Sequence, residues 1–197
     1  FPYTTLFRSL VPVTLEQLKI NAKVAGEHVL KLIDMNIKPS EIMTKKAFEN
    51  AIMVHAAIAG SSNALIHIPA IAHELGIDID PELFDEIHKK IPFILNIRPS
   101  GFYPGSYFWY AGGVPAIMEE IKEFLHLDVI TVTGKTLGEN LDDLKNNGYY
   151  ENCNKYLEAL GVSKEDIIKT KENPIQAQGA IAILKGNLAP GGAVVKH

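Results

Sequence analysis

The segment from Asn173 to Lys196, NPIQAQGAIAILKGNLAPGGAVVK, constrains the fold of this chain more than any other stretch. It places the apolar run Ala180–Leu184 between two clusters of turn residues and then begins a second alternating run at Ala193. This pattern predicts two strands joined by a tight connection. Because the second run has hardly begun at the last residue, we expect these strands to be the first strands of a further domain. We therefore expect the chain to be an internal fragment of a longer protein.

Residues 1–9, FPYTTLFRS, have a different character. They lack the charged start, continuous apolar run and small-residue cleavage site of a secretory signal. Their sequence resembles the translation of a common sequencing-adaptor oligonucleotide. We expect an artefactual tail, the alternative being an ordinary N-terminal tail, and leave these residues out of the fold prediction.

Composition predicts a soluble globular protein, since 47% of the residues are hydrophobic and 21% are charged. The formal net charge of −4 provides no basic field for nucleic acid or an anionic membrane. No apolar run reaches the roughly 18 residues of a membrane span. The single cysteine, Cys153, excludes an internal disulfide and is typical of a reducing compartment. A cytoplasmic location is the resulting expectation.

Apolar periodicity and capping signals predict a helix-rich α/β fold. Short buried strands are predicted at residues 91–97 and 128–132, and their alternation with helices favours a parallel component. A polar segment with a proline, Lys171–Pro174, is the predicted domain boundary. The resulting units are residues 1–9, 10–171 and 172–197. Helices are predicted over residues 14–36, 44–58, 62–75, 114–125 and 136–144, after Asp80 and Gly148, and from Ser163.

The candidate binding residues are Ser61, Ser62 and Asn63, in the sequence AGSSN between two apolar helices. Small residues allow a tight turn, and the hydroxyl and amide groups can cap the next helix. A helix start lined with serine and asparagine can also bind an anion or a carboxylate. Taken alone, the residues favour capping over ligand contact and leave both open.

Other motifs are weaker. The run TVTGKT at residues 131–136 lacks the glycine that a phosphate loop requires, since that position is Val129. A strand, a glycine turn and a helix capped by Thr136 and Glu139 explain it better. The histidines show no zinc-site spacing, so His55, His67 and His73 are interpreted as core or helix-surface residues. One thiol cannot hold an iron–sulfur cluster.

Several strings in order along the chain resemble the dihydroxy-acid dehydratase and phosphogluconate dehydratase family. The similarity extends from about Pro39 to Lys196 and includes PSEIMTKKAFENAI, AGSSNALIHIPAIA, RPSG, AGGVPAIMEE, DVITVTGKTLGENL and ILKGNLAPGGAVVK. Where the family usually has GGSTN at the substrate cleft, this chain has Ala59 for the first glycine and Ser62 for the threonine. The resemblance thus implies that Ser61, Ser62 and Asn63 form part of the cleft.

The resemblance also implies an activity, a fold and cofactors. Members eliminate water from a 2,3-dihydroxy acid, either a branched-chain amino-acid precursor or a sugar acid, to give a 2-oxo acid. They use an iron–sulfur cluster and Mg²⁺, with a serine of the second domain as base, and they form homo-oligomers. The implied fold is the helix-rich part of a three-layer α/β domain with a short parallel sheet, followed by the first strands of a β-barrel-like second domain.

None of the family's cluster cysteines, its catalytic serine or most of its magnesium ligands has a counterpart here, so no catalytic residue and no metal ligand is assigned. We expect this chain to be inactive alone. The alternative is a stand-alone α/β binding or interaction module without chemistry.

Overall fold

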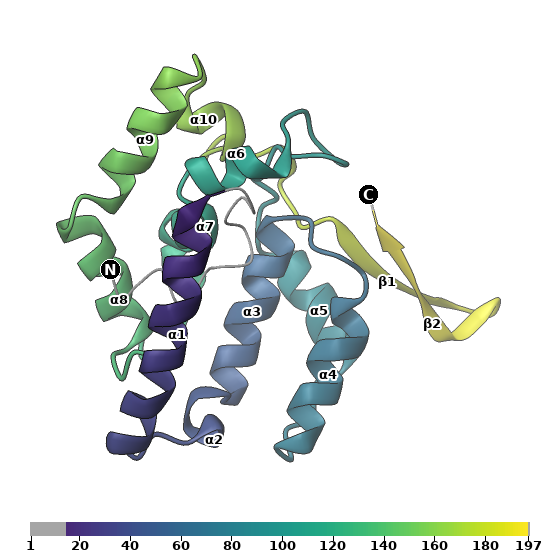
Figure 1. Ribbon diagram of the computed structural model, residues 1–197. Coiled ribbons are helices and arrows are strands. Elements are labelled where there is room, and N and C mark those ends of the chain that lie inside the picture. Colours follow the sequence, from purple (N-terminus) through teal and green to yellow (C-terminus); the bar gives the residue numbers. More distant parts are fainter. Residues whose placement is uncertain (1–14, 197) are drawn as a thin grey trace.

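The computed structural model describes residues 15–196, which form a helical body with a hairpin of two strands at one side (Figure 1). None of the helices in this range is long and apolar enough to cross a membrane. The elements in chain order are α1 (Glu16–Asp34), α2 (Pro39–Ile42), α3 (Lys45–Ala57), α4 (Ala64–Glu74), α5 (Pro81–His88), α6 (Gly105–Tyr110), α7 (Gly113–Glu120), η3 (Lys122–Phe124), α8 (Leu137–Asn146), α9 (Tyr149–Ala159), α10 (Lys164–Ile167), β1 (Ile181–Gly186) and β2 (Ala189–Lys196).

Helix α3 is the centre of the core. Its N-cap residue is Thr44, whose hydroxyl accepts a hydrogen bond from the Ala47 amide at 3.3 Å and so satisfies one free donor of the first turn. Ile52, Ala56 and Ala57 are fully buried between α4, α5 and α7. The small alanines allow these helices to approach closely, and the helix predicted over residues 44–58 is confirmed.

Helix α4 confirms the helix predicted over residues 62–75, but despite its apolar composition it is not a buried helix. Ala72 is its only buried residue, while Ile66 and Ile71 are 70% and 48% exposed. The reason is position: α4 lies at the edge of the body and packs mainly on α3 (Figure 1). An apolar composition on every side did not ensure a partner on every side.

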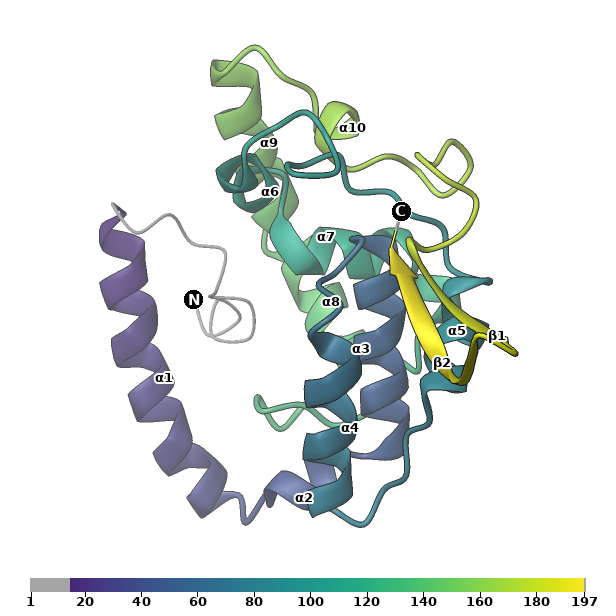
Figure 2. The same ribbon diagram turned by 90° about the vertical axis from the view of Figure 1, so that its right-hand side faces the viewer.

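Helix α1 confirms the long helix predicted over residues 14–36, of which Thr14 lies outside the described residues. Its ribbon stands away from α3 and α4 and joins them through α2 (Figure 2). Val29 and Ile33, two members of its apolar stripe, are 56% and 69% exposed. The periodicity identified the helix correctly, but within the described chain the stripe is not covered.

The predicted strand at residues 91–97 is an extended, buried segment without a continuous ladder. Phe93, Leu95 and Ile97 each make a single bridge, to Gln176, Ile168 and Tyr103. Likewise, the strand predicted at residues 128–132 is reduced to one bridge between Ile130 and Thr136. Within residues 15–196 the only sheet is the antiparallel β1–β2 pair, so the expected parallel sheet is not observed there.

The hairpin predicted from the last segment is confirmed. Strand β1 pairs with β2 antiparallel, from Ile181 opposite Lys196 to Gly186 opposite Ala189, with an irregularity after Leu184. Ile181 is buried where β1 packs against α5, whereas Leu188 at the tip is 97% exposed. The hairpin is therefore anchored at its base and projects from the body at its tip (Figure 1).

Candidate functional site

The loop that carries the predicted binding residues begins with the C-terminal cap of α3. The Gly60 amide donates to the His55 carbonyl at 2.9 Å and the Ala59 amide donates to the Ala56 carbonyl at 3.3 Å, which is the Schellman arrangement. Ala59 adopts a positive φ of 49°, a left-handed conformation that usually requires glycine. The alanine at this position therefore does not prevent the turn, but it occupies a strained conformation.

Ser61, Ser62 and Asn63 follow this cap, and all three are exposed. The Ser61 hydroxyl accepts a hydrogen bond from the Asn63 amide at 3.3 Å, and the Ser61 carbonyl accepts one from the Ala64 amide at 3.0 Å. The Ser62 and Asn63 side chains make no hydrogen bond to any residue in the range 15–196. The loop thus presents two polar side chains to solvent at the start of α4, where backbone amides give a partial positive charge.

The loop is attached to the core through its backbone. The imidazole of His55 on α3 lies 2.9 Å, measured from Nε2, from the Ser61 carbonyl oxygen. His55 is buried, and its Nδ1 lies 3.1 Å from Nε2 of the buried His88 on α5. Burial lowers the pKa of both imidazoles, that of His88 to about 4, so both are neutral at physiological pH.

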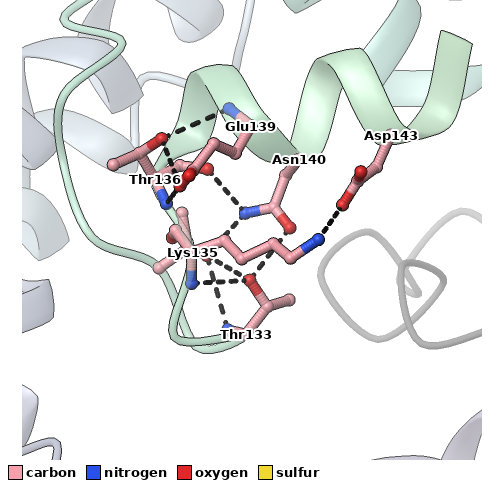
Figure 3. A network of polar contacts seen from close by, with 7 residues as sticks. Thr133, Lys135, Thr136, Glu139, Asn140 and Asp143 are labelled. Atoms are coloured by element: carbon pink, nitrogen blue, oxygen red, sulfur yellow. Dashed lines mark hydrogen bonds and ion pairs between the residues drawn. The ribbon is translucent and has the colours of Figure 1, made fainter. Parts of the chain in front are cut away.

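A second polar cluster lies at the start of α8, in the segment that contains TVTGKT (Figure 3). Thr136 and Glu139 form the predicted capping box, and the buried amide of Asn140 donates to the Thr131 hydroxyl at 2.8 Å and the Thr136 carbonyl at 2.9 Å. The Asn140 oxygen accepts from the Thr133 hydroxyl at 2.9 Å. These groups satisfy one another, which supports the structural interpretation of this motif.

Lys135 of this cluster is paired with Asp143 on α8. In a phosphate loop the lysine would instead point toward the phosphates. The structure therefore gives no support to a nucleotide site at this turn.

The described residues do not fit a metal or cluster site. Within residues 15–196, His, Cys, Asp and Glu form no group of three or more that could hold a metal ion. Burial raises the pKa of the Cys153 thiol to about 11, so the thiolate needed for ligation is disfavoured. The structure thus places the predicted loop residues together, with their backbone held by His55, and adds no metal ligands to them.

Sequence reasoning missed the contact between His55 and His88. It placed His55 in the core or on a helix surface and gave His88 no role. The two residues are separated by 33 positions and lie on different helices, so no spacing rule pairs them. The available signal was indirect: Gly60 and Gly179 are the residues that leave room for the two rings.

Comparison with known proteins identifies the relatives of this chain. The family model for the N-terminal part of dihydroxy-acid/6-phosphogluconate dehydratases matches residues 4–140, and the model for the C-terminal part matches residues 166–197. Dihydroxy-acid dehydratase 1 of Methanosarcina acetivorans is 46% identical over 176 residues, which are 89% of this chain and 30% of the relative. The dihydroxy-acid dehydratase of Ignicoccus hospitalis is 40% identical over 190 residues, 95% of this chain and 32% of the relative.

The matches extend across both parts of the described chain, the helical body and the hairpin. The chain spans about 30% of the length of the curated relatives that it matches. It belongs to the dihydroxy-acid and 6-phosphogluconate dehydratase family.

Proposed function

We propose that the full-length protein containing this chain is a hydro-lyase that removes water from a 2,3-dihydroxy acid to give a 2-oxo acid. One observation carries this proposal: both family models match in order along the chain, and its relatives are named dihydroxy-acid dehydratases. The substrate is then a small carboxylate, either a branched-chain amino-acid precursor or a sugar acid. The reaction removes the proton at C2 and the hydroxyl at C3, and the resulting enol becomes the 2-oxo product.

The iron–sulfur cluster and Mg²⁺ of this family would supply Lewis-acid assistance to the departure of the hydroxyl. The residues present here do not fit either group. The raised pKa of Cys153 disfavours the thiolate, and residues 15–196 contain no group of three possible metal ligands. We therefore assign the ligands of both cofactors, and the base, to parts of the polypeptide that this chain does not include. By itself the chain is then inactive.

The contribution of this chain is one wall of the substrate cleft, at Ser61, Ser62 and Asn63. The support is geometric: the Ser62 and Asn63 side chains are exposed and make no bond within residues 15–196, at the start of an 11-residue helix. A carboxylate is stabilised at such a position by the helix dipole and by hydroxyl and amide donors. Both residues are thus suited to bind the substrate carboxylate or a hydroxyl group.

The proposed architecture of the whole protein follows the same family. The extended segment at residues 91–97 would belong to a short sheet of a three-layer α/β domain, and residues 172–197 would begin a β-barrel-like domain. The exposed apolar residues Leu184, Leu188 and Val194 on the hairpin support further strands at that surface. Assembly as a homo-oligomer, a cytoplasmic location and the absence of a nucleic-acid partner belong to the proposal as well.

The test uses the full-length protein, purified without oxygen and reconstituted with iron, sulfide and Mg²⁺. It is assayed for 2-oxo acid formation from a branched-chain 2,3-dihydroxy acid and from an aldonate. Ser62→Ala and Asn63→Ala are each expected to lower kcat/KM about 10-fold, since each removes a hydrogen bond to a charged or developing charged group. Ser163→Ala, at a cap on α10, is the control for loss of a serine hydroxyl. Turnover of neither substrate would contradict the activity, and unchanged kcat/KM in both variants would contradict the site.

A further inference from the structure

His55 and His88 form a continuous chain of hydrogen bonds between two distant parts of the fold. The Ile181 amide, at the start of β1, lies 3.2 Å from His88 Nδ1, and His88 Nε2 lies 3.1 Å from His55 Nδ1. His55 Nε2 lies 2.9 Å from the Ser61 carbonyl oxygen. The four residues, which we call the histidine relay, connect the hairpin to the candidate substrate loop through α5 and α3.

The chemistry of the two ends determines where the protons lie. The Ile181 amide can only donate, so His88 Nδ1 accepts and its proton is on Nε2. The Ser61 carbonyl can only accept, so His55 donates from Nε2 and accepts from His88 at Nδ1. A single arrangement with two neutral imidazoles therefore satisfies every group in the histidine relay, and protonation of either ring would place two donors face to face.

Glycines hold the two rings in place. A β-carbon at Gly60 would lie 2.1 Å from Cδ2 of His55, and one at Gly179 would lie 2.5 Å from Nδ1 of His88. The Gly179 amide also donates to the His88 carbonyl at 2.7 Å. Each ring therefore has backbone directly against it, and neither can rotate without displacing the chain.

The charged groups around the histidine relay are few. Asp85, one turn before His88 on α5, accepts from the Ile183 amide of β1 at 3.0 Å and is paired with Lys89. Its negative charge favours the protonated form of His88, while burial and the neighbouring His55 oppose it. Lys196 on β2 opposes protonation of His55. Phe84 contributes an edge contact to His55, with ring centres 6.1 Å apart.

We propose that His55 and His88 are positioning residues for the dehydration reaction: their relay holds the Ser61 backbone, and with it the Ser62 and Asn63 side chains, at a defined position relative to β1. This inference rests on the proposed function, because it concerns the same loop. It also assigns a structural reason for β1 packing on α5, since the first residue of the hairpin provides the donor that orients both rings. The loop then takes up its binding position only when the hairpin is seated.

The decisive experiment compares His55→Gln with His55→Asn in the reconstituted full-length enzyme. The glutamine amide can reach the position of imidazole Nε2 and keep the bond to the Ser61 carbonyl, but it loses the link to His88. The asparagine amide reaches only the position of Nδ1, so it keeps the link to His88 and releases Ser61. Each variant breaks one bond of the histidine relay, so a merely structural role would affect both alike.

The expected result is a difference between the two variants. His55→Asn should lower kcat/KM at least about 10-fold relative to His55→Gln, because a small displacement of a substrate-positioning group has a large effect on rate. Backbone hydrogen exchange of the peptide covering residues 60–66 should be faster in His55→Asn than in His55→Gln. The exposed His67→Gln serves as the control for loss of a histidine and should change neither measurement.

Equal exchange rates and equal kcat/KM in the two His55 variants would overturn the proposal. Should either variant fail to fold, His88→Asn and His88→Gln divide the relay at its other end. His88→Gln should lose the hydrogen bond from the Ile181 amide, and His88→Asn should keep that bond. Backbone hydrogen exchange at residue 181 measures the difference. Equal exchange in the two variants also overturns the proposal. If the wild-type enzyme converts no dihydroxy acid but the exchange differences are present, the proposed function fails and the tether to the loop stands.

Discussion

Two turns in this chain have similar compositions but are held in place in different ways, one by its backbone and the other by its side chains. The turn at residues 59–63 and the turn at residues 131–136 each follow an apolar segment, are rich in small hydroxyl residues and lead into a helix. In the second, side chains bond to one another around the buried Asn140. In the first, the backbone carbonyl of Ser61 is held by His55 while the side chains of Ser62 and Asn63 face solvent. A turn held by its backbone leaves its side chains free to bind a ligand, and a turn held by its side chains does not.

The largest effect should come from breaking the side-chain network at the second turn. Asn140→Ala removes three hydrogen bonds of a buried amide, each contributing about 1 kcal/mol, so the free energy of unfolding should fall by about 3 kcal/mol. Urea unfolding of the chain, followed by circular dichroism, measures this change. Asn146→Ala, at the exposed end of the same helix, is the control.

The same experiment on the first turn should give a small change. Ser62→Ala removes an exposed hydroxyl that makes no bond within residues 15–196, so stability should change by no more than about 0.5 kcal/mol. A loss for Ser62→Ala comparable to that for Asn140→Ala would mean that the two turns are built alike, and the contrast would be lost.

The next effect tests the packing of the first turn against His55. Gly60→Ala places a methyl group 2.1 Å from the His55 ring. The ring cannot move away because both of its nitrogens are hydrogen-bonded. The free energy of unfolding should fall by about 2 kcal/mol through overpacking. In Gly26→Ala on α1, the new methyl group meets no atom within 4 Å, so this variant should gain about 0.5–1 kcal/mol from helix propensity. Equal responses of the two glycines would show that the ring is free to move.

The third effect is the dependence of stability on pH. The pKa of His88 in the folded chain is about 4, below its ordinary value of 6.5, so the unfolded chain binds more protons between these values. The contribution of His88 to the free energy of unfolding is therefore fully present above pH 6.5, and it is lost as the pH falls toward 4. Between pH 7 and pH 5 the loss should be about 2 kcal/mol from His88, and the lowered pKa of His55 acts in the same direction.

The matched variants identify the source of this loss. His88→Asn keeps the bond to Ile181 but cannot be protonated, so its stability should change less between pH 7 and pH 5. His67→Gln, which removes an exposed histidine, should retain the full decrease. A wild-type stability that rises toward pH 5 would contradict the neutral relay.

The sequence predicted the longer helices well because their signals are local, and it missed the short helices α2 and α6. The capping box at Thr136 and Glu139, the apolar face of α5 and the glycine at the end of α4 each depend on neighbours within a few positions. The hairpin was equally visible, since alternating residues between turn clusters predict strands without knowledge of the rest of the fold.

The failures concern partners far away in sequence. Residues 91–97 are as apolar as a sheet strand, but strand identity requires a neighbour, and here Leu95 bridges only Ile168. The exposure of Ile66 on α4 depends on which helices lie beside it. For the candidate loop, the sequence indicated which polar residues precede α4. It could not indicate that His55 holds the Ser61 carbonyl or that His88 of α5 is hydrogen-bonded to His55.

The smallest effect is the most direct test of how the first turn is built. Ala59 has a φ of 49°, and this left-handed conformation costs a residue with a β-carbon roughly 1 kcal/mol more than glycine. Ala59→Gly should therefore raise the free energy of unfolding by about 0.5 kcal/mol, because glycine's greater freedom in the unfolded chain offsets part of the gain. Ala51→Gly, at an exposed position inside α3, should lower it by about 1 kcal/mol. The same substitution then has opposite effects inside α3 and in the cap that follows it, which a left-handed backbone at Ala59 explains. A loss at both positions would mean that the backbone at residue 59 is unstrained and that the loop is held in place by other contacts.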